Sequence, residues 1–382
     1  MNNILVRKER MIYIMDNILS KKREINFELL RIILMIFIII HHLTINALGL
    51  SNIIDNKIVC DFNKYSILSF IECFTVIGVN VFFLISGYFG IKLKMKKMFI
   101  LMFDLYFYST IIRIIGLLLG VINFDHITIN EIIVPFNTYW FMLAYILLMI
   151  FSPYLNILIN NISKKQYLMF VIIICLVFGI FDFLTDNFII RSNNGYSLIS
   201  AIYMYIIGGG VKKFDIVKSE KEKNKFLITY VVLCIINFLI SLIGIYIIKD
   251  GNMVWRLYSY NNILNILSSI ALLRYFKRVT IKEKYNNLIL WISPSVLAVY
   301  FLHSSSWLGK IRNMPLVYLV DKVNIVILVM LMIVYSIFIF VICIIIDKIK
   351  KKLFDRYILK FIEYIDRKFI YFKNILEKRL YK

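Results

Sequence analysis

The sequence predicts an all-α polytopic membrane protein, a bundle of about ten transmembrane helices with both termini in the cytoplasm. Three observations support this fold class. Hydrophobic residues make up 61% of the chain and the mean hydropathy is +0.80, whereas an ordinary globular protein is about half apolar. The apolar residues fall in runs of roughly 20, the length that crosses a bilayer. Lysine and arginine concentrate in every second connection between these runs.

The apolar runs define the expected spans. In chain order they lie at 29–50, 67–89, 98–122, 138–159, 167–189, 196–211, 226–248, 257–276, 286–306 and 317–346. Only four prolines and fourteen glycines interrupt the chain, so a second, soluble domain is not expected. We therefore divide the chain into a basic N-terminal segment (1–28), one membrane domain (29–347) and a basic C-terminal tail (348–382).

The positions of the basic residues test these spans and predict their orientation. The N-terminus, the tail and every second connection hold 35 Lys and Arg, whereas the alternate connections hold 8. A missing span would destroy this alternation, so we expect an even number of spans in the cell membrane, with both termini cytoplasmic. The net charge of +22 then reflects topology, and nucleic acid is not an expected partner.

Two further patterns concern the cysteines and the tail. The five cysteines have no C-x-x-C spacing, which gives no metal site and no disulfide framework. The tail repeats apolar residues at three- and four-residue steps with Lys and Arg between them: Phe354, Ile358, Phe361, Ile365, Phe369, Phe372 and Leu376. This pattern predicts an amphipathic basic helix on the anionic inner leaflet, or alternatively a coiled-coil seam between copies of the chain.

The first span carries ionisable groups that are costly in hydrocarbon. Arg31 and His42 are eleven residues apart, so they share one helix face about 16 Å apart along the axis, while His41 lies about 80° round the helix. Arg31 alone is compatible with a side chain that reaches the headgroups. His42 is too deep for that, which leaves a functional residue or a hydrogen-bonded histidine within the bundle.

The second span carries a polar stripe. Its members fall within an arc of roughly 140° at 100° per residue: Glu72, Thr75, Asn80, Ser86 and Gly87. Because the first two spans are antiparallel, Glu72 is expected within about a turn of the depth of His42, where it would orient the imidazole and raise its basicity. The alternative is that Glu72 lies near the outer interface.

Aromatic and histidine residues mark two later spans. Tyr139 and Trp140 open the fourth span, where composition alone indicates an interfacial aromatic belt. The ninth span contains Pro294, which predicts a kink, and places His303 at its outer end.

These residues resemble the acyltransferase 3 family of membrane-embedded O-acyltransferases. The resemblance rests on four segments in the family's order, which together cover nearly the whole chain: "FELLRIILMIFIIIHH", "GVNVFFLISGYF", "YWFMLAYILLMIFSPYLN" and "SVLAVYFLH". It implies a ten-span bundle that takes acyl-CoA, usually acetyl-CoA, from the cytoplasm and transfers the acyl group to a sugar hydroxyl. No bound cofactor is implied, since the acyl-CoA is a substrate.

The resemblance also assigns residues. The family's first span carries an arginine followed after ten residues by a histidine, which Arg31 and His42 match and His41 does not. It further implies that Trp140 and Tyr145 are pocket walls. It gives motif status to three more residues: Ser86, Gly87 and His303.

Together these observations predict an O-acetyltransferase. His42 would be the general base with Glu72 as its partner, Arg31 would hold the coenzyme arm, and Ser86 or Asn80 would donate to the oxyanion. The acceptor would be a surface polysaccharide, an exopolysaccharide or its lipid-linked precursor. The alternative is a multi-span transporter or flippase of a lipid-linked sugar, in which the same polar residues line a path.

Overall fold

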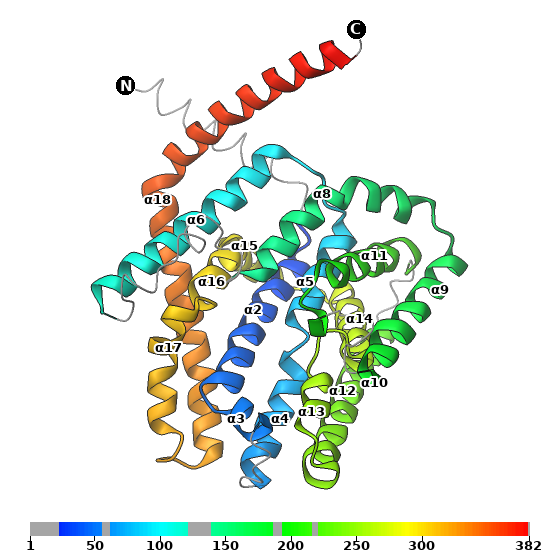
Figure 1. Cartoon of the computed structure of the whole chain (residues 1–382), viewed down its shortest axis with the longest axis vertical. Coiled ribbons are helices and arrows are strands. Elements are labelled where there is room, and N and C mark those ends of the chain that lie inside the picture. Colours follow the sequence, from blue (N-terminus) through cyan, green and yellow to red (C-terminus); the bar gives the residue numbers. More distant parts are fainter. Residues whose placement is uncertain (1–22, 56–61, 121–138, 186–192, 216–220, 381–382) are drawn as a thin grey trace.

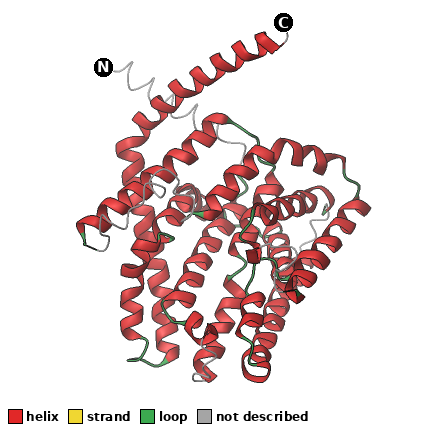
Figure 2. Ribbon diagram, viewed as in Figure 1, coloured by secondary structure: helices red, strands yellow, loops and turns green. Residues whose placement is uncertain are grey.

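The computed structural model describes residues 23–55, 62–120, 139–185, 193–215 and 221–380. Within these ranges every regular element is helical and there is no strand, as Figure 2 shows. A bundle of helices satisfies each backbone hydrogen bond inside its own segment, which hydrocarbon requires. The predicted all-α polytopic membrane fold is therefore confirmed.

The helices follow one another closely along the chain. The first half contains α2 (Ile25–Asn46), α3 (Leu50–Asp55), α4 (Phe62–Thr75), α5 (Gly78–Phe89), α6 (Met95–Leu118), α8 (Trp140–Asn161), α9 (Lys164–Ile174), η3 (Cys175–Phe181), α10 (Asp182–Leu184) and η4 (Asn193–Gly195). The second half contains α11 (Leu198–Phe214), α12 (Lys221–Leu242), η5 (Ile243–Ile248), α13 (Gly251–Leu257), α14 (Ile263–Lys277), η6 (Glu283–Tyr285), α15 (Asn286–Ile292), η7 (Ser293–Ser295), α16 (Val296–His303), α17 (Ser306–Leu319) and α18 (Ile325–Leu380).

Eight helical segments of the described chain are long and apolar enough to cross a membrane. The two expected spans that are missing from this set correspond to α11 and α14, which have 17 and 15 residues. At 1.5 Å per residue these helices are shorter than the roughly 30 Å of hydrocarbon. The predicted number of ten spans is therefore not confirmed, although α11 and α14 do lie within the bundle.

Helix α2 is the central element of the bundle. It packs against α4, α5, α14, α15, α16 and α18, and Figure 1 shows it surrounded by the other long helices. The start of α2 lies beside the ends of α5 and α14, since Phe27 contacts Phe89 and Asn26 donates to the carbonyl of Phe276. We call this end of the bundle, where α2 begins and α18 leaves, the basic end.

The second span is broken in its middle. A turn at Val76 and Ile77 separates α4 from α5. The polar stripe is therefore divided between two helices. Its members contact different parts of the bundle, as described below.

Helices α5 and α11 touch through glycine. A Cβ atom at Gly87 would lie 1.8 Å from the carbonyl oxygen of Tyr205, and one at Gly208 would lie 2.0 Å from that of Leu84. No side chain fits between the two backbones at these positions. Gly87 thus supports the bundle by allowing close packing, and it does not line the cavity described below.

The ninth span is also interrupted, as Pro294 predicted. Pro294 lies in the short 3-10 segment η7 between α15 and α16. After His303 the chain continues through the 14 residues of α17 before it turns into α18, and Figure 1 shows α17 beside α18. His303 is the last residue of α16 and of the span Glu283–His303, at a span end as expected, and its side chain is buried.

Helix α18 continues from the last span into the tail without a break. It has 56 residues and includes nearly all of the segment 348–382 that we expected to be separate. In Figure 1 its red end passes obliquely over the end of the bundle. The tail also packs against α6, where Glu363 pairs with Lys96 at 2.8 Å. Most of the N-terminal segment 1–28 lies outside the described residues.

Candidate active site

A cavity of about 310 Å³ opens along one face of α2. Arg31, Met35, Ile38 and His42 line it, which is the face that a spacing of three to four residues generates. The other lining residues are Val79, Phe82, Ser86, Trp140, Phe141, Tyr145, Tyr196, Tyr260, Ser293, Pro294, Val296, Leu297, Tyr300 and Ser304. The structure therefore brings Arg31 and His42 to one space.

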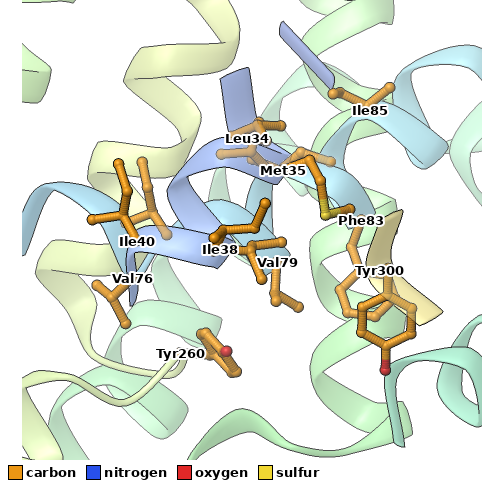
Figure 3. Packing of buried hydrophobic residues seen from close by; sticks show 14 of the residues in the cluster. Leu34, Met35, Ile38, Ile40, Val76, Val79, Phe83, Ile85, Tyr260 and Tyr300 are labelled. Atoms are coloured by element: carbon orange, nitrogen blue, oxygen red, sulfur yellow. The ribbon is translucent and has the colours of Figure 1, made fainter. Parts of the chain in front are cut away.

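The cavity wall is mostly apolar. Figure 3 shows Tyr260 and Tyr300 on opposite sides of the space next to Ile38 and Val79. An apolar space with a few polar groups excludes bulk water and strengthens each polar contact that a ligand makes there.

Arg31 lines the part of the cavity that is nearest the basic end of the bundle. Its guanidinium donates to the carboxylate of Glu28 one turn earlier and lies 5.6 Å from the ring centre of Phe89. Lys212 lies over the same ring at 5.8 Å. Two cations beside one carboxylate leave a positive excess at this end, which favours an anionic ligand group.

A second charge cluster stabilises the basic end. Asp215 accepts hydrogen bonds from Arg274 at 3.2 Å and from Arg278 at 2.7 Å and 3.0 Å, and Lys277 lies 3.6 Å from its carboxylate. Burial alone would raise the pKa of Asp215, but these cations outweigh it and lower the pKa to about 2. The cluster ties the end of α11 to the end of α14.

His42 has neighbours on both sides of its ring. The centre of the His42 ring lies 5.3 Å from that of His41 and 5.2 Å from that of His303. His42 lines the cavity, and none of the hydrogen bonds found within the described chain involves its ring. Its nitrogens are therefore available to a substrate.

Glu72 pairs with His41 rather than with His42. Oε1 of Glu72 lies 2.6 Å from Nδ1 of His41, and the Glu72 side chain is fully buried. The expected pairing with His42 is therefore wrong. The sequence placed Glu72 by depth alone, within about a turn of His42, and the packing of α4 against α2 selects the side of the helix that Glu72 meets.

His303 reaches the site from α16. Its Nδ1 lies 2.7 Å from the carbonyl oxygen of Val299, which cannot donate, so Nδ1 carries the proton and Nε2 accepts. The hydroxyl of Ser304 lies 3.4 Å from Nε2. Arg312 of α17 donates to the carbonyl of His303 and so holds the end of α16.

The remaining members of the polar stripe have separate roles in the packing. Asn80 donates to the carbonyl of Tyr260 at 2.8 Å and is almost completely buried, so it is unavailable as an oxyanion donor. Ser86 lines the cavity, with its hydroxyl donating to the carbonyl of Phe82 at 2.9 Å. Thr75 bonds to the carbonyl of Ile71 in its own helix.

Aromatic side chains gather at the other end of the cavity. Trp140 lies 4.7 Å from Tyr196 and 5.9 Å from Tyr260 between ring centres, and Tyr196 lies 4.8 Å from Tyr260. Trp140 and Tyr145 are thus cavity walls, as the resemblance implied. Sequence reasoning missed Tyr196 and Tyr260, because it placed them in the expected spans 196–211 and 257–276, whereas both lie in connections between helices.

Comparison with known proteins agrees with this site. The model of the acyltransferase 3 family, an acyltransferase domain, matches residues 24–348, which is most of the chain. This chain belongs to the acyltransferase 3 family. No protein with curated annotation and no solved structure gives a significant match. The family makes the protein a membrane acyltransferase with an acyl donor and an acceptor substrate.

Sequence reasoning about this acyltransferase also missed Ser293. Ser293 lines the cavity, yet its hydroxyl is buried and has no hydrogen-bond partner among the described residues. An unpaired buried hydroxyl is costly unless a ligand completes it. Ser293 stands directly before Pro294 in the break of the ninth span, and a serine beside a proline is by itself no signal.

The same acyltransferase offers no place for a metal in the part of the chain that the structure describes. No group of three or more His, Cys, Asp or Glu side chains there is arranged to hold an ion. His41, His42 and His303 approach one another, but Glu72 contacts only the first of them.

Proposed function

We propose that this acyltransferase moves an acetyl group from acetyl-CoA, or a related acyl-CoA, to a hydroxyl of a cell-surface polysaccharide, an exopolysaccharide or its lipid-linked precursor. The observation that supports the proposal is one cavity that is lined by both the Arg31 guanidinium and the His42 imidazole. Thioester transfer to an alcohol needs a base, an oxyanion donor and the exclusion of water, and this cavity offers all three.

His42 acts as the general base. The acceptor hydroxyl attacks the thioester carbonyl carbon, a C–O bond forms, and the hydroxyl proton passes to His42. The tetrahedral intermediate then collapses, the C–S bond breaks, and the coenzyme thiolate takes the proton back from His42. His303 and His41 stand on either side and restrict the orientation of the His42 ring.

The tetrahedral intermediate carries a negative oxygen that needs a hydrogen-bond donor. Ser293 is the best candidate, because it lines the cavity and its buried hydroxyl has no partner in the described chain, whereas that of Ser86 already donates to a backbone carbonyl. One such donor is worth about 2.7–4 kcal/mol in other acyl-transfer enzymes.

The two ends of the cavity suggest how the substrates enter. Arg31 at the basic end suits a phosphate or carbonyl of the coenzyme arm, which would come from the cytoplasm in the predicted orientation. The aromatic end, with Trp140, Tyr196 and Tyr260, suits the apolar face of a sugar ring. The acceptor would then bind from the outer side of the cell membrane.

The decisive experiment is transfer of label from acetyl-CoA to carbohydrate. Membranes that contain the protein are incubated with labelled acetyl-CoA, and label is measured in cell-envelope carbohydrate. We expect transfer by the wild type and none by His42→Ala. Asn161→Ala is the control, since Asn161 is exposed at the end of α8, its amide bonds only within its own helix, and it does not line the cavity. Full activity of His42→Ala, or sugar transport without acylation, would overturn the proposal.

A further inference from the structure

The ninth span breaks where it lines the cavity, and the break leaves backbone groups without helical partners. Proline at 294 has no N–H to donate, and the residues Ser293–Ser295 form a short 3-10 turn between α15 and α16. In an apolar bundle the carbonyls freed by such a break must find other donors.

Two lysines of α18 supply those donors. Nζ of Lys348 lies 2.5 Å from the carbonyl oxygen of Trp291, and Nζ of Lys351 lies 3.0 Å from that of Pro294. The Lys348 ammonium also lies 4.6 Å from the ring centre of Trp291. The segment just before and within the break is therefore held from α18.

Lys351 is itself held in place. Its ammonium pairs with Asp347 at 2.6 Å, and Asp347 accepts a hydrogen bond from the hydroxyl of Tyr108 in α6 at 2.6 Å. The Tyr108 ring stacks on Phe301 of α16 with centres 5.8 Å apart. Helices α6, α16 and α18 thus meet at one buried polar contact, beside the break.

Two residues of the break, Ser293 and Pro294, line the cavity. Leu297, in the first turn of α16, lines it as well. The Ser293 hydroxyl has no partner among the described residues, so its direction depends on the backbone of the break. The backbone there depends in turn on the bond that Pro294 accepts from Lys351.

We propose that Lys351 is a positioning residue of this acyltransferase, which acts through the backbone of Pro294 to aim the Ser293 hydroxyl at the reacting carbonyl. Lys351 lies beyond the family match, which ends at residue 348. The tail helix therefore contributes to the active site itself, in addition to any contact with lipid. The inference rests on the proposed function for the role of Ser293.

A double-mutant cycle tests the coupling. Lys351→Met should lower kcat roughly tenfold with little change in the KM for acyl-CoA, because the Pro294 carbonyl loses its charged donor and the Ser293 hydroxyl is no longer held in place. Lys351→Arg should recover most of the activity. In a Ser293→Ala background, Lys351→Met should have no further effect, since residues that act as one unit are not additive.

Lys352→Met is the matched control. It removes the same charge one residue further along α18, where the side chain is exposed, and it should leave kcat and KM unchanged. If Lys351→Met and Ser293→Ala have independent effects that multiply, or if Lys351→Met leaves kcat unchanged, the proposal is wrong.

A second measurement does not depend on acyl transfer. Leu297→Cys places a thiol in the cavity beside the break, and its reaction rate with a small water-soluble thiol reagent is followed by mass spectrometry at that position. We expect Lys351→Met to change this reaction rate at least about threefold. Lys351→Arg and Lys352→Met should leave the rate unchanged. A changed rate without any acyl transfer by the wild type would refute the proposed function only. An unchanged rate would refute the positioning role even if transfer is observed.

Discussion

Nδ1 of His41 and Oε1 of Glu72 lie 2.6 Å apart, and neither side chain lines the cavity. The pair joins α2 to α4 next to His42 without contacting the space where a substrate would bind. The pair therefore contributes to the packing around His42 and does not contact the substrate.

The His41–Glu72 pair predicts strong coupling between two substitutions. His41→Leu leaves a fully buried carboxylate without its partner, which costs about 3–5 kcal/mol. The double variant His41→Leu, Glu72→Leu removes both polar groups and should regain much of the lost stability. Thermal unfolding of the purified protein in detergent measures these stabilities. The prediction is contradicted if the two single variants are equally destabilised and the loss in the double variant is the sum of the two.

His303 predicts an effect on turnover. His303→Phe keeps a ring beside His42 but removes the Nδ1 donor that bonds to Val299 and the Nε2 acceptor. We expect kcat to fall roughly tenfold while the KM for acyl-CoA stays within a factor of about two, because the His42 ring loses its oriented neighbour. Steady-state transfer assays decide this. An unchanged kcat would show that His303 has no part in orienting His42.

The aromatic end of the cavity predicts a selective effect on acceptor binding. Tyr260→Ala should raise the KM for the carbohydrate acceptor roughly tenfold and leave that for acyl-CoA unchanged, whereas Tyr260→Phe should stay near the wild type because it keeps the ring. Tyr285→Ala is the control, since Tyr285 is exposed and outside the cavity. A rise in the KM for acyl-CoA instead would place the donor at this end.

The contact between α5 and α11 predicts a loss of fold. Gly87→Ala forces a Cβ atom into the carbonyl of Tyr205, so α5 and α11 must separate and the variant should unfold well below the wild type, by several kcal/mol. At Gly309 a Cβ atom would meet only an ordinary contact at 3.6 Å from Arg312. Gly309→Ala should therefore be neutral, and detergent-solubilised yield and melting temperature compare the two.

Asp215 predicts a pH-dependent contribution to stability. Its pKa is lowered from 3.8 to about 2 in the folded chain, so the carboxylate stabilises the fold above about pH 4, and this contribution is lost as the pH falls towards 2. Asp215→Asn should lower the melting temperature by roughly 2–4 °C at pH 7. The difference from the wild type should shrink as the pH is lowered below 4, and a constant difference across this range would contradict the assignment.

The fold class followed from properties that are local in the sequence. Hydropathy and run length decide whether a segment enters a bilayer, and these depend on composition alone. The phase between Arg31 and His42 is also local, because an α-helix has a fixed period. Sequence could therefore place both on one face and separate them from His41.

The interruptions of the helices were harder to predict. The break at Val76 and Ile77 involves two ordinary apolar residues, so nothing in the sequence indicates it, and it divides the polar stripe between α4 and α5. Pro294 did predict a break in the ninth span. Ser293, however, lines the cavity only because η7 packs against α2, which the sequence does not indicate.

The sequence by itself determined that this protein is a helical membrane bundle and that Arg31 and His42 share a helix face, since both depend on hydropathy and helical period. Tertiary structure alone decided that Glu72 meets His41, that His303 meets His42, and that Lys351 reaches Pro294. Each of these pairs joins different helices, and the rotation and depth of one helix against another depend on side-chain packing over the whole bundle.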